Sequence, residues 1–78
     1  HWQDIWNPLT DDGDAFRLAV KLCLTPMQHH LYDEWIVEVT RMHRYWDALA
    51  EEKCGDDPLA ATRRAIVRAA AAIGKAMP

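Results

Sequence analysis

The amino-acid sequence predicts an α+β domain, in which two helices flank a small antiparallel sheet that is either a β-hairpin or a three-stranded sheet. Capping residues followed by long helix-forming runs near both ends of the chain predict the helices. In the centre, apolar and polar residues alternate over residues 35–41, which predicts a strand. With 78 residues, the chain has the length of a single domain covering residues 1–78.

The chain opens with a segment that we expect to be an extended arm, residues 1–9. Pro8 disfavours helical backbone at Asn7 because its ring clashes with the preceding residue. Trp2, Ile5 and Trp6 are too apolar for a free tail. They are expected either to fold back over the core or to leave one tryptophan exposed as a binding anchor.

The first helix is predicted to run from Thr10 or Asp11 to Leu24. Oxygen-bearing side chains at its start can accept hydrogen bonds from the free N–H groups of the first turn, and their negative charge suits the helix dipole. Beyond the start, the polar side chains occupy one narrow stripe of the helix: Asp14, Arg17 and Lys21. A helix that is apolar around the rest of its circumference is expected to be central and largely buried.

The last helix has the strongest signals in the chain, with Asp57 as N-cap and Pro58 at the first helical position. At 100° per residue its larger apolar side chains gather on one side, namely Leu59, Ile66, Ala70, Ile73 and Met77. A basic stripe lies on the opposite side and consists of Arg64, Arg68 and Lys75, with Arg63 beside it. This stripe is a candidate phosphate-facing surface, or a solvated face paired with local acids.

The centre of the chain supports two interpretations, because residues 35–41 alternate like a half-buried strand but also belong to a helical pattern. Steps of four and three connect an apolar series that consists of Leu31, Trp35, Val39, Met42, Trp46 and Leu49. Residues 25–28, Thr-Pro-Met-Gln, also fit the start of a helix. An all-α three-helix bundle is therefore the alternative fold.

Two segments of the chain carry a resemblance to a known family. Residues 6–14, WNPLTDDGD, continuing through residues 17–22, RLAVKL, resemble the start of a family of short phage and prophage proteins of unassigned function. Residues 61–70, ATRRAIVRAA, with Ile73, Gly74 and Met77, resemble that family's C-terminal signature. The resemblance covers about half the chain and implies a phage or prophage origin, but it carries no catalytic or binding residues.

The same resemblance implies two signature helices around a variable centre that is often strand-like. It favours the sheet over the three-helix bundle. The expected strands are Met27–Tyr32, Trp35–Arg41 and Trp46–Glu51, with Asp33 and Glu34 as the tight connection between the first two.

Residues suited to catalysis or to metal binding are present, but their pattern favours structural roles. The acidic clusters lie at predicted helix starts, where capping explains them: Asp11, Asp12 and Asp14, then Asp56 and Asp57. The candidate soft ligands follow no recognised metal-binding spacing: His29, His30, His43, Cys23 and Cys54. The chain has no serine nucleophile and no glycine-rich phosphate loop. We therefore predict no enzyme activity, no catalytic residue, no metal and no cofactor, with reduced cysteines.

Charge and hydropathy narrow the class of partner. The formal net charge of −3 argues mildly against general nucleic-acid binding, because phosphate contacts need a surplus of Lys and Arg. No apolar run approaches the roughly 20 residues of a membrane span, so we expect no membrane association and a cytoplasmic location in a bacterial host.

The leading functional hypothesis is a non-enzymatic, phage-encoded accessory protein that binds a host or phage protein. An inhibitor of a host defence complex, of the anti-CRISPR kind, is one concrete form of it. The residue types that dominate interface hot spots supply the candidate binding residues: Trp2, Trp6, Tyr45, Trp46, Arg63, Arg64, Arg68 and Lys75.

Two alternatives stay open at this point. One is a nucleic-acid-binding module that uses the basic stripe of the last helix. The other is a self-associating structural or assembly protein, suggested by the many alanines of that helix, so that both a monomer and a homodimer are compatible with the sequence.

Overall fold

The computed structural model describes residues 7–41 and 44–76, apart from the side chains of residues 44–47 and 75–76. Within these residues the order of elements is α1 (Asp12–Leu22), β1 (Leu24–Leu31), β2 (Glu34–Arg41), β3 (Arg44–Lys53) and α2 (Pro58–Ala76). The predicted α+β class, with two helices around a three-stranded antiparallel sheet, is confirmed. The alternative three-helix bundle is wrong, because residues 24–53 pair as strands.

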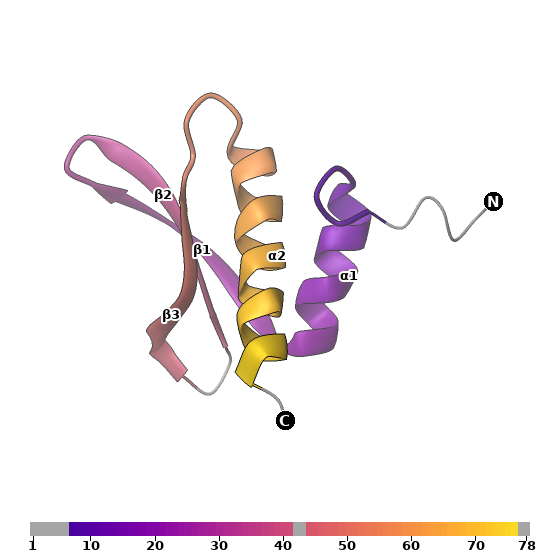
Figure 1. Ribbon diagram of the computed structural model, residues 1–78. Coiled ribbons are helices and arrows are strands. Elements are labelled where there is room, and N and C mark those ends of the chain that lie inside the picture. Colours follow the sequence, from indigo (N-terminus) through magenta and orange to yellow (C-terminus); the bar gives the residue numbers. More distant parts are fainter. Residues whose placement is uncertain (1–6, 42–43, 77–78) are drawn as a thin grey trace.

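The sheet is a meander with strand order β1-β2-β3, and both neighbouring pairs are antiparallel (Figure 1). The register between β1 and β2 places Pro26 opposite Val39 and Gln28 opposite Val37. Because directly opposed residues share a face of the sheet, this register fixes which side chains of β1 lie beside the buried valines of β2. The β2–β3 register shifts near Thr40, where β3 is irregular.

Both helices lie on the same face of the sheet. Helix α2 contacts all three strands, and α1 lies beside α2, where it also contacts β1 (Figure 1). At the centre of this packing, Val37 and Val39 of β2 are at most 1% exposed. The alanines at positions 61, 65 and 69 of α2 are fully buried. Because alanine has a short side chain, it permits a close approach between the backbone of α2 and its neighbours.

Helix α1 is shorter and more exposed than the sequence predicts. It begins after Asp11, whose side chain accepts a hydrogen bond from the Asp14 N–H, and ends at Leu22 rather than Leu24. Phe16 and Val20 are 67% and 60% exposed, so the expected central, largely buried position is wrong. The reason is that α1 packs mainly on α2 and β1, which cover one side of it, while its last carbonyl group also accepts a hydrogen bond from Arg41 of β2.

The segment before α1 is a turn. The carbonyl of Asn7 accepts hydrogen bonds from the N–H groups of Thr10 and Asp11, at 3.1 and 2.9 Å. The expectation of extended backbone is therefore wrong for residues 8 and 9, which belong to this turn, and residues 1–6 lie outside the described part of the chain. Trp2 and Trp6, two of the candidate binding residues, lie outside the described part of the chain.

The connection between β1 and β2 is a two-residue turn at Tyr32 and Asp33, whose φ angles are 49° and 68°. Leu31 and Glu34 pair directly across it, so the turn is one residue earlier than predicted. Two successive positive φ angles are typical of the type I′ hairpin turn, whose twist matches that of the strands. The residues Tyr-Asp lack the Asn-Gly signature of this turn, which is why the sequence did not locate it.

Helix α2 begins as predicted. The Asp57 side chain accepts a hydrogen bond from the Ala60 N–H at 3.0 Å, and Pro58 is the first helical residue. Ile66 and Ile73 are buried on the expected apolar side, but Leu59 is 62% exposed. Neither described helix combines the length and the hydropathy needed to cross a bilayer.

We expect the substitution Ala65→Leu to destabilise the fold by about 2 kcal/mol or more, because a larger side chain overfills a fully buried position between α2 and its neighbours. The matched control Ala71→Leu, at an exposed position of the same helix, is expected to change stability by less than about 0.5 kcal/mol. Urea denaturation followed by circular dichroism measures both. Equal effects of the two substitutions would contradict the packing described.

We expect the substitution Tyr32→Asn to stabilise the protein by about 0.5–1 kcal/mol, because asparagine adopts positive φ at lower cost than tyrosine. Tyr32 is 93% exposed, so little packing is lost. The control Glu34→Asn changes a residue of β2 and is expected to bring no gain. Thermal unfolding compares the three proteins, and an unchanged or lower Tm for Tyr32→Asn would contradict the assigned turn.

Candidate partner-binding groove

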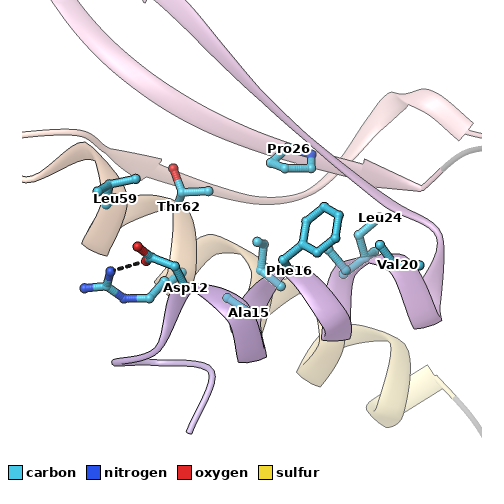
Figure 2. A pocket seen from close by; sticks show the side chains of 11 residues that line it. Asp12, Ala15, Phe16, Val20, Leu24, Pro26, Leu59 and Thr62 are labelled. Carbon is cyan, nitrogen blue, oxygen red and sulfur yellow. Dashed lines mark hydrogen bonds and ion pairs between the residues drawn. The ribbon is translucent and has the colours of Figure 1, made fainter.

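A groove of about 290 Å³ lies between α1, the first half of α2 and the start of β1 (Figure 2). From α1 it is lined by Asp12, Phe16 and Val20, which lie four residues apart and therefore share one side of the helix. The other walls are formed by α2, through Leu59, Thr62, Arg63 and Ile66, and by β1, through Leu24 and Pro26. We call this hollow the apolar groove.

Large apolar side chains in the walls of the groove are left open to solvent. Phe16, Val20 and Leu59 are 67%, 60% and 62% exposed, and they come from two different helices. Single exposed hydrophobic residues are common on protein surfaces, but several that line one concave surface mark an interaction or ligand site. The arrangement of these three side chains makes the apolar groove the candidate functional site.

The one ion pair in the described lining of the groove joins its two helices. Arg63 of α2 donates from Nη1 to Asp12 of α1 at 2.5 Å. The Nε of the same arginine donates to the Leu9 carbonyl at 2.8 Å. Both charges are thereby satisfied within the protein, so an occupant of this groove needs no charged group to match them. The chemistry of the groove favours an apolar occupant.

Three further hollows of about 300, 260 and 350 Å³ follow it along the sheet. Each hollow shares lining residues with the next: first Pro26, Leu59 and Thr62, then Gln28 and Pro58, then Trp35 and Gly55. We call this row of four neighbouring hollows, from α1 to the β1–β2 hairpin, the extended groove. Its far end is acidic, since Asp33, Glu34 and Asp56 line it together with Lys53.

The predicted basic stripe of α2 meets a carboxylate of the sheet. Arg64 Nε donates to Oε1 of Glu52 at 3.1 Å, and Arg68 donates to Oε2 of the same side chain. Arg68 also donates to the Glu51 carbonyl at 3.2 Å. The hydrogen bond from Arg68, and after it that from Arg64, lower the pKa of Glu52 below its usual value, although partial burial opposes this.

The structure thus separates the candidate binding residues. Arg63 lies in the apolar groove, whereas Arg64 and Arg68 lie over β3 with Glu52. Tyr45 and Trp46 belong to β3, and Lys75 belongs to the end of α2, but the side chains of these three lie outside the described part. Whether any of these residues contacts a partner stays a prediction.

Sequence analysis missed Phe16, Val20 and Leu59 as site residues because it placed all three on buried sides of their helices. The spacing of positions 12, 16 and 20 is visible in the sequence, as is that of positions 59, 62, 63 and 66. This spacing shows only that residues share one side of a helix. It does not show whether another element covers that side, which depends on how α1 packs beside α2.

The residues considered for catalysis or metal binding are dispersed. No group of three or more His, Cys, Asp or Glu side chains within the described residues is placed to hold a metal ion. Adjacent His29 and His30 point to opposite faces of β1: the first lies 3.3 Å from Glu38, and the second packs on the Trp35 ring. Cys23 is an exposed free thiol and Cys54 a buried one. His43 lies outside the description.

The acidic residues at the start of α1, Asp11, Asp12 and Asp14, bind backbone N–H groups and arginines of the same chain. The Asp14 carboxylate is buried and accepts a hydrogen bond from the Asn7 N–H at 2.7 Å, as well as one from Arg17. The hydrogen bond from the Asn7 backbone, with a smaller contribution from Arg17, lowers the pKa of Asp14 below its usual value. These contacts hold the turn at residues 7–10 against α1, close to the Leu9 carbonyl that Arg63 binds.

We expect the substitution Glu52→Gln to lower stability by about 0.5–1 kcal/mol at pH 7, the range for largely exposed ion pairs. Because the folded-state pKa of Glu52 is lowered, its contribution is present above the unfolded pKa of about 4.3 and is lost as the pH falls through the folded pKa. The difference in Tm between the two proteins should therefore narrow at pH 3. The control is Glu51→Gln, whose side chain is exposed. A difference that persists unchanged at pH 3 would contradict the assigned ion pairs.

Comparison with known proteins identified no relative of this chain. No family model, no curated protein and no solved structure matches the chain significantly. The resemblance to short phage and prophage proteins therefore stays a prediction from residues 6–22 and 61–77.

Proposed function

We propose that the protein is non-enzymatic and acts by binding another protein, with the apolar groove as its docking surface. The observation that carries the proposal is the exposure of Phe16, Val20 and Leu59 along one concave surface. Covering such side chains removes apolar surface from water, which is the main favourable term in protein association. Aromatic residues such as Phe16, which lines the groove, are also enriched in the buried cores of protein–protein interfaces.

The kind of partner follows from the resemblance and from the charge of the chain. A phage-encoded protein of this size would bind a host or phage protein, and inhibition of a host defence complex is a concrete form of that activity. The acidic end of the extended groove, with Asp33 and Asp56, favours a partner that brings a basic group to the hairpin. The net charge of −3 also attracts a basic partner, and it does so over a longer range.

The nucleic-acid alternative has less support from the geometry. Arg64 and Arg68 share the carboxylate of Glu52, which offsets part of the positive charge that a phosphate backbone would meet. Arg63 is paired with Asp12. Self-association remains the other alternative, because a second copy of the chain is itself a protein that could cover Phe16 and Val20.

We expect the purified protein to capture a bacterial or phage protein from lysate, and the substitution Phe16→Gln to weaken that capture at least tenfold, or by about 1.4 kcal/mol. Phe16 is 67% exposed in a helix, and glutamine is a good helix former, so folding should be retained. Quantitative mass spectrometry of the captured proteins, followed by titration with the purified partner, gives the change in Kd.

The matched control is Tyr32→Asn, which removes another exposed aromatic side chain at the hairpin, where it does not line the groove. This variant should bind like the parent protein. Equal binding by the parent and Phe16→Gln would contradict the groove as the docking surface. Sedimentation of the protein alone tests the remaining alternative, because a dimer that Phe16→Gln dissociates would identify a second copy as the occupant.

A further inference from the structure

We propose that the partner docks as an extended peptide segment, which pairs as a fourth strand with the free edge of β1 and turns alternate side chains into the extended groove. This inference rests on the proposed function and specifies the conformation and chemistry of the bound segment. Three conditions have to hold. Strand β1 needs an unpaired edge, and identifiable residues of β1 must direct their main-chain N–H and C=O groups toward that edge. The extended groove must also lie on the face of the sheet toward which alternate side chains of the added strand would point.

Strand β1 is an edge strand in the described structure. It pairs with β2 along its whole length, and the sheet order β1-β2-β3 places no described strand on its other side. The free main-chain groups of an edge strand are a template for pairing with an additional extended chain. Peptide recognition by strand addition uses this template for affinity and side-chain pockets for specificity.

The hairpin turn fixes which residues of β1 point their main-chain groups outward. In a two-residue hairpin, the residues that flank the turn are hydrogen-bonded to each other, so Leu31 directs its main-chain groups toward β2. Because this direction alternates along a strand, Pro26, Gln28 and His30 direct theirs toward the free edge. A hydrogen bond made by β2 agrees with this alternation. The carbonyl of Trp35, which lies opposite His30, accepts from the Cys54 N–H at 2.9 Å and therefore points away from β1.

Pro26 is compatible with the same assignment. Proline lacks an N–H group and is tolerated within a sheet where that group would face away from the ladder. The free edge of β1 therefore offers the N–H groups of Gln28 and His30 as donors, and the carbonyls of Pro26, Gln28 and His30 as acceptors. Met27 directs its main-chain groups inward, to the pairing with Glu38 of β2.

The extended groove lies on the face of the sheet that α2 covers, and an added strand beside β1 would direct alternate side chains toward this face. Pro26 and Gln28 have their side chains on the face that α2 covers, because they lie opposite the buried Val39 and Val37. Both residues line the extended groove, and Figure 2 shows Pro26 above the gap that Phe16 and Val20 border. Every second side chain of a strand beside β1 would point toward this face.

The length of β1 and the chemistry of the groove favour a strand over a helix as the bound segment. The eight residues of β1 span about 26 Å, which an extended segment of equal length matches residue by residue. A helix would bury the outward N–H groups of Gln28 and His30 without offering main-chain partners for them. The lining predicts a segment with apolar side chains at alternate positions near α1 and a basic residue near Asp33 and Asp56.

The test uses a displayed library of random peptides of about twelve residues, selected for binding to the intact protein, with enriched sequences then synthesised and titrated. The decisive variants are Gln28→Pro and Gln28→Ala. Both remove the Gln28 side chain, including its weak contact to Cys54, but only the first removes the outward N–H. Because both variants lose the side chain that lines the groove, the comparison between them isolates the N–H. Gln28→Pro is expected to bind peptides about tenfold more weakly than Gln28→Ala, as for loss of one main-chain hydrogen bond.

The outcomes separate this inference from the proposed function. Peptides with alternating apolar residues, whose binding falls with Phe16→Gln and is about tenfold weaker to Gln28→Pro than to Gln28→Ala, would support both. Peptides that depend on Phe16 but bind Gln28→Pro and Gln28→Ala equally would overturn strand addition and leave the groove as the docking surface. A library that yields no peptide dependent on Phe16 would overturn both. Circular dichroism of the variants verifies that each retains the parent fold.

Discussion

The structure depends on the close packing of α2 against the centre of the sheet. Ala61, Ala65 and Ala69 are fully buried, and Val37 and Val39 of β2 are buried with them. Short side chains on α2 bring its backbone near the strands, so that one helix reaches all three of them. This close approach leaves little room for large side chains, and the largest fully buried ones among the described residues are Val37, Val39 and Thr40.

The position of α1 follows from that packing and creates the groove. Helix α2 occupies the face of the sheet, so α1 is placed beside it. Among the strands α1 packs mainly on β1, and its Leu22 carbonyl accepts a hydrogen bond from Arg41 of β2 at 3.4 Å. Ala15 and Ala19 pack inward, while Phe16 and Val20 of the same helix remain exposed. The ion pair between Asp12 and Arg63 joins the two helices at one end of the gap. The apolar groove is thus a consequence of how two helices of unequal length share a small sheet.

The sequence predicted the features that depend on local signals. The Asp57–Pro58 start of α2 is one example, and the alternation over residues 35–41 of β2 is another. The turn at Tyr32 and Asp33 was misplaced by one residue, because aspartate tolerates a positive φ but tyrosine rarely adopts one. A basic stripe paired with local acids was one of the two expectations for Arg64 and Arg68, and they do pair with Glu52. The identity of that partner and the exposure of Phe16 were not predictable, since each depends on which elements meet in three dimensions rather than on the pattern within one element.

The sharing of Glu52 by Arg64 and Arg68 has a consequence for how this surface can evolve. A single carboxylate sets the balance of charge over the outer side of α2 and β3, so one codon change from acid to neutral would release two guanidinium groups together. A face whose positive charge is now partly offset by Glu52 would then attract polyanions more strongly. Descendants of one ancestral sequence could in this way diverge in the chemistry of that surface while retaining the same backbone.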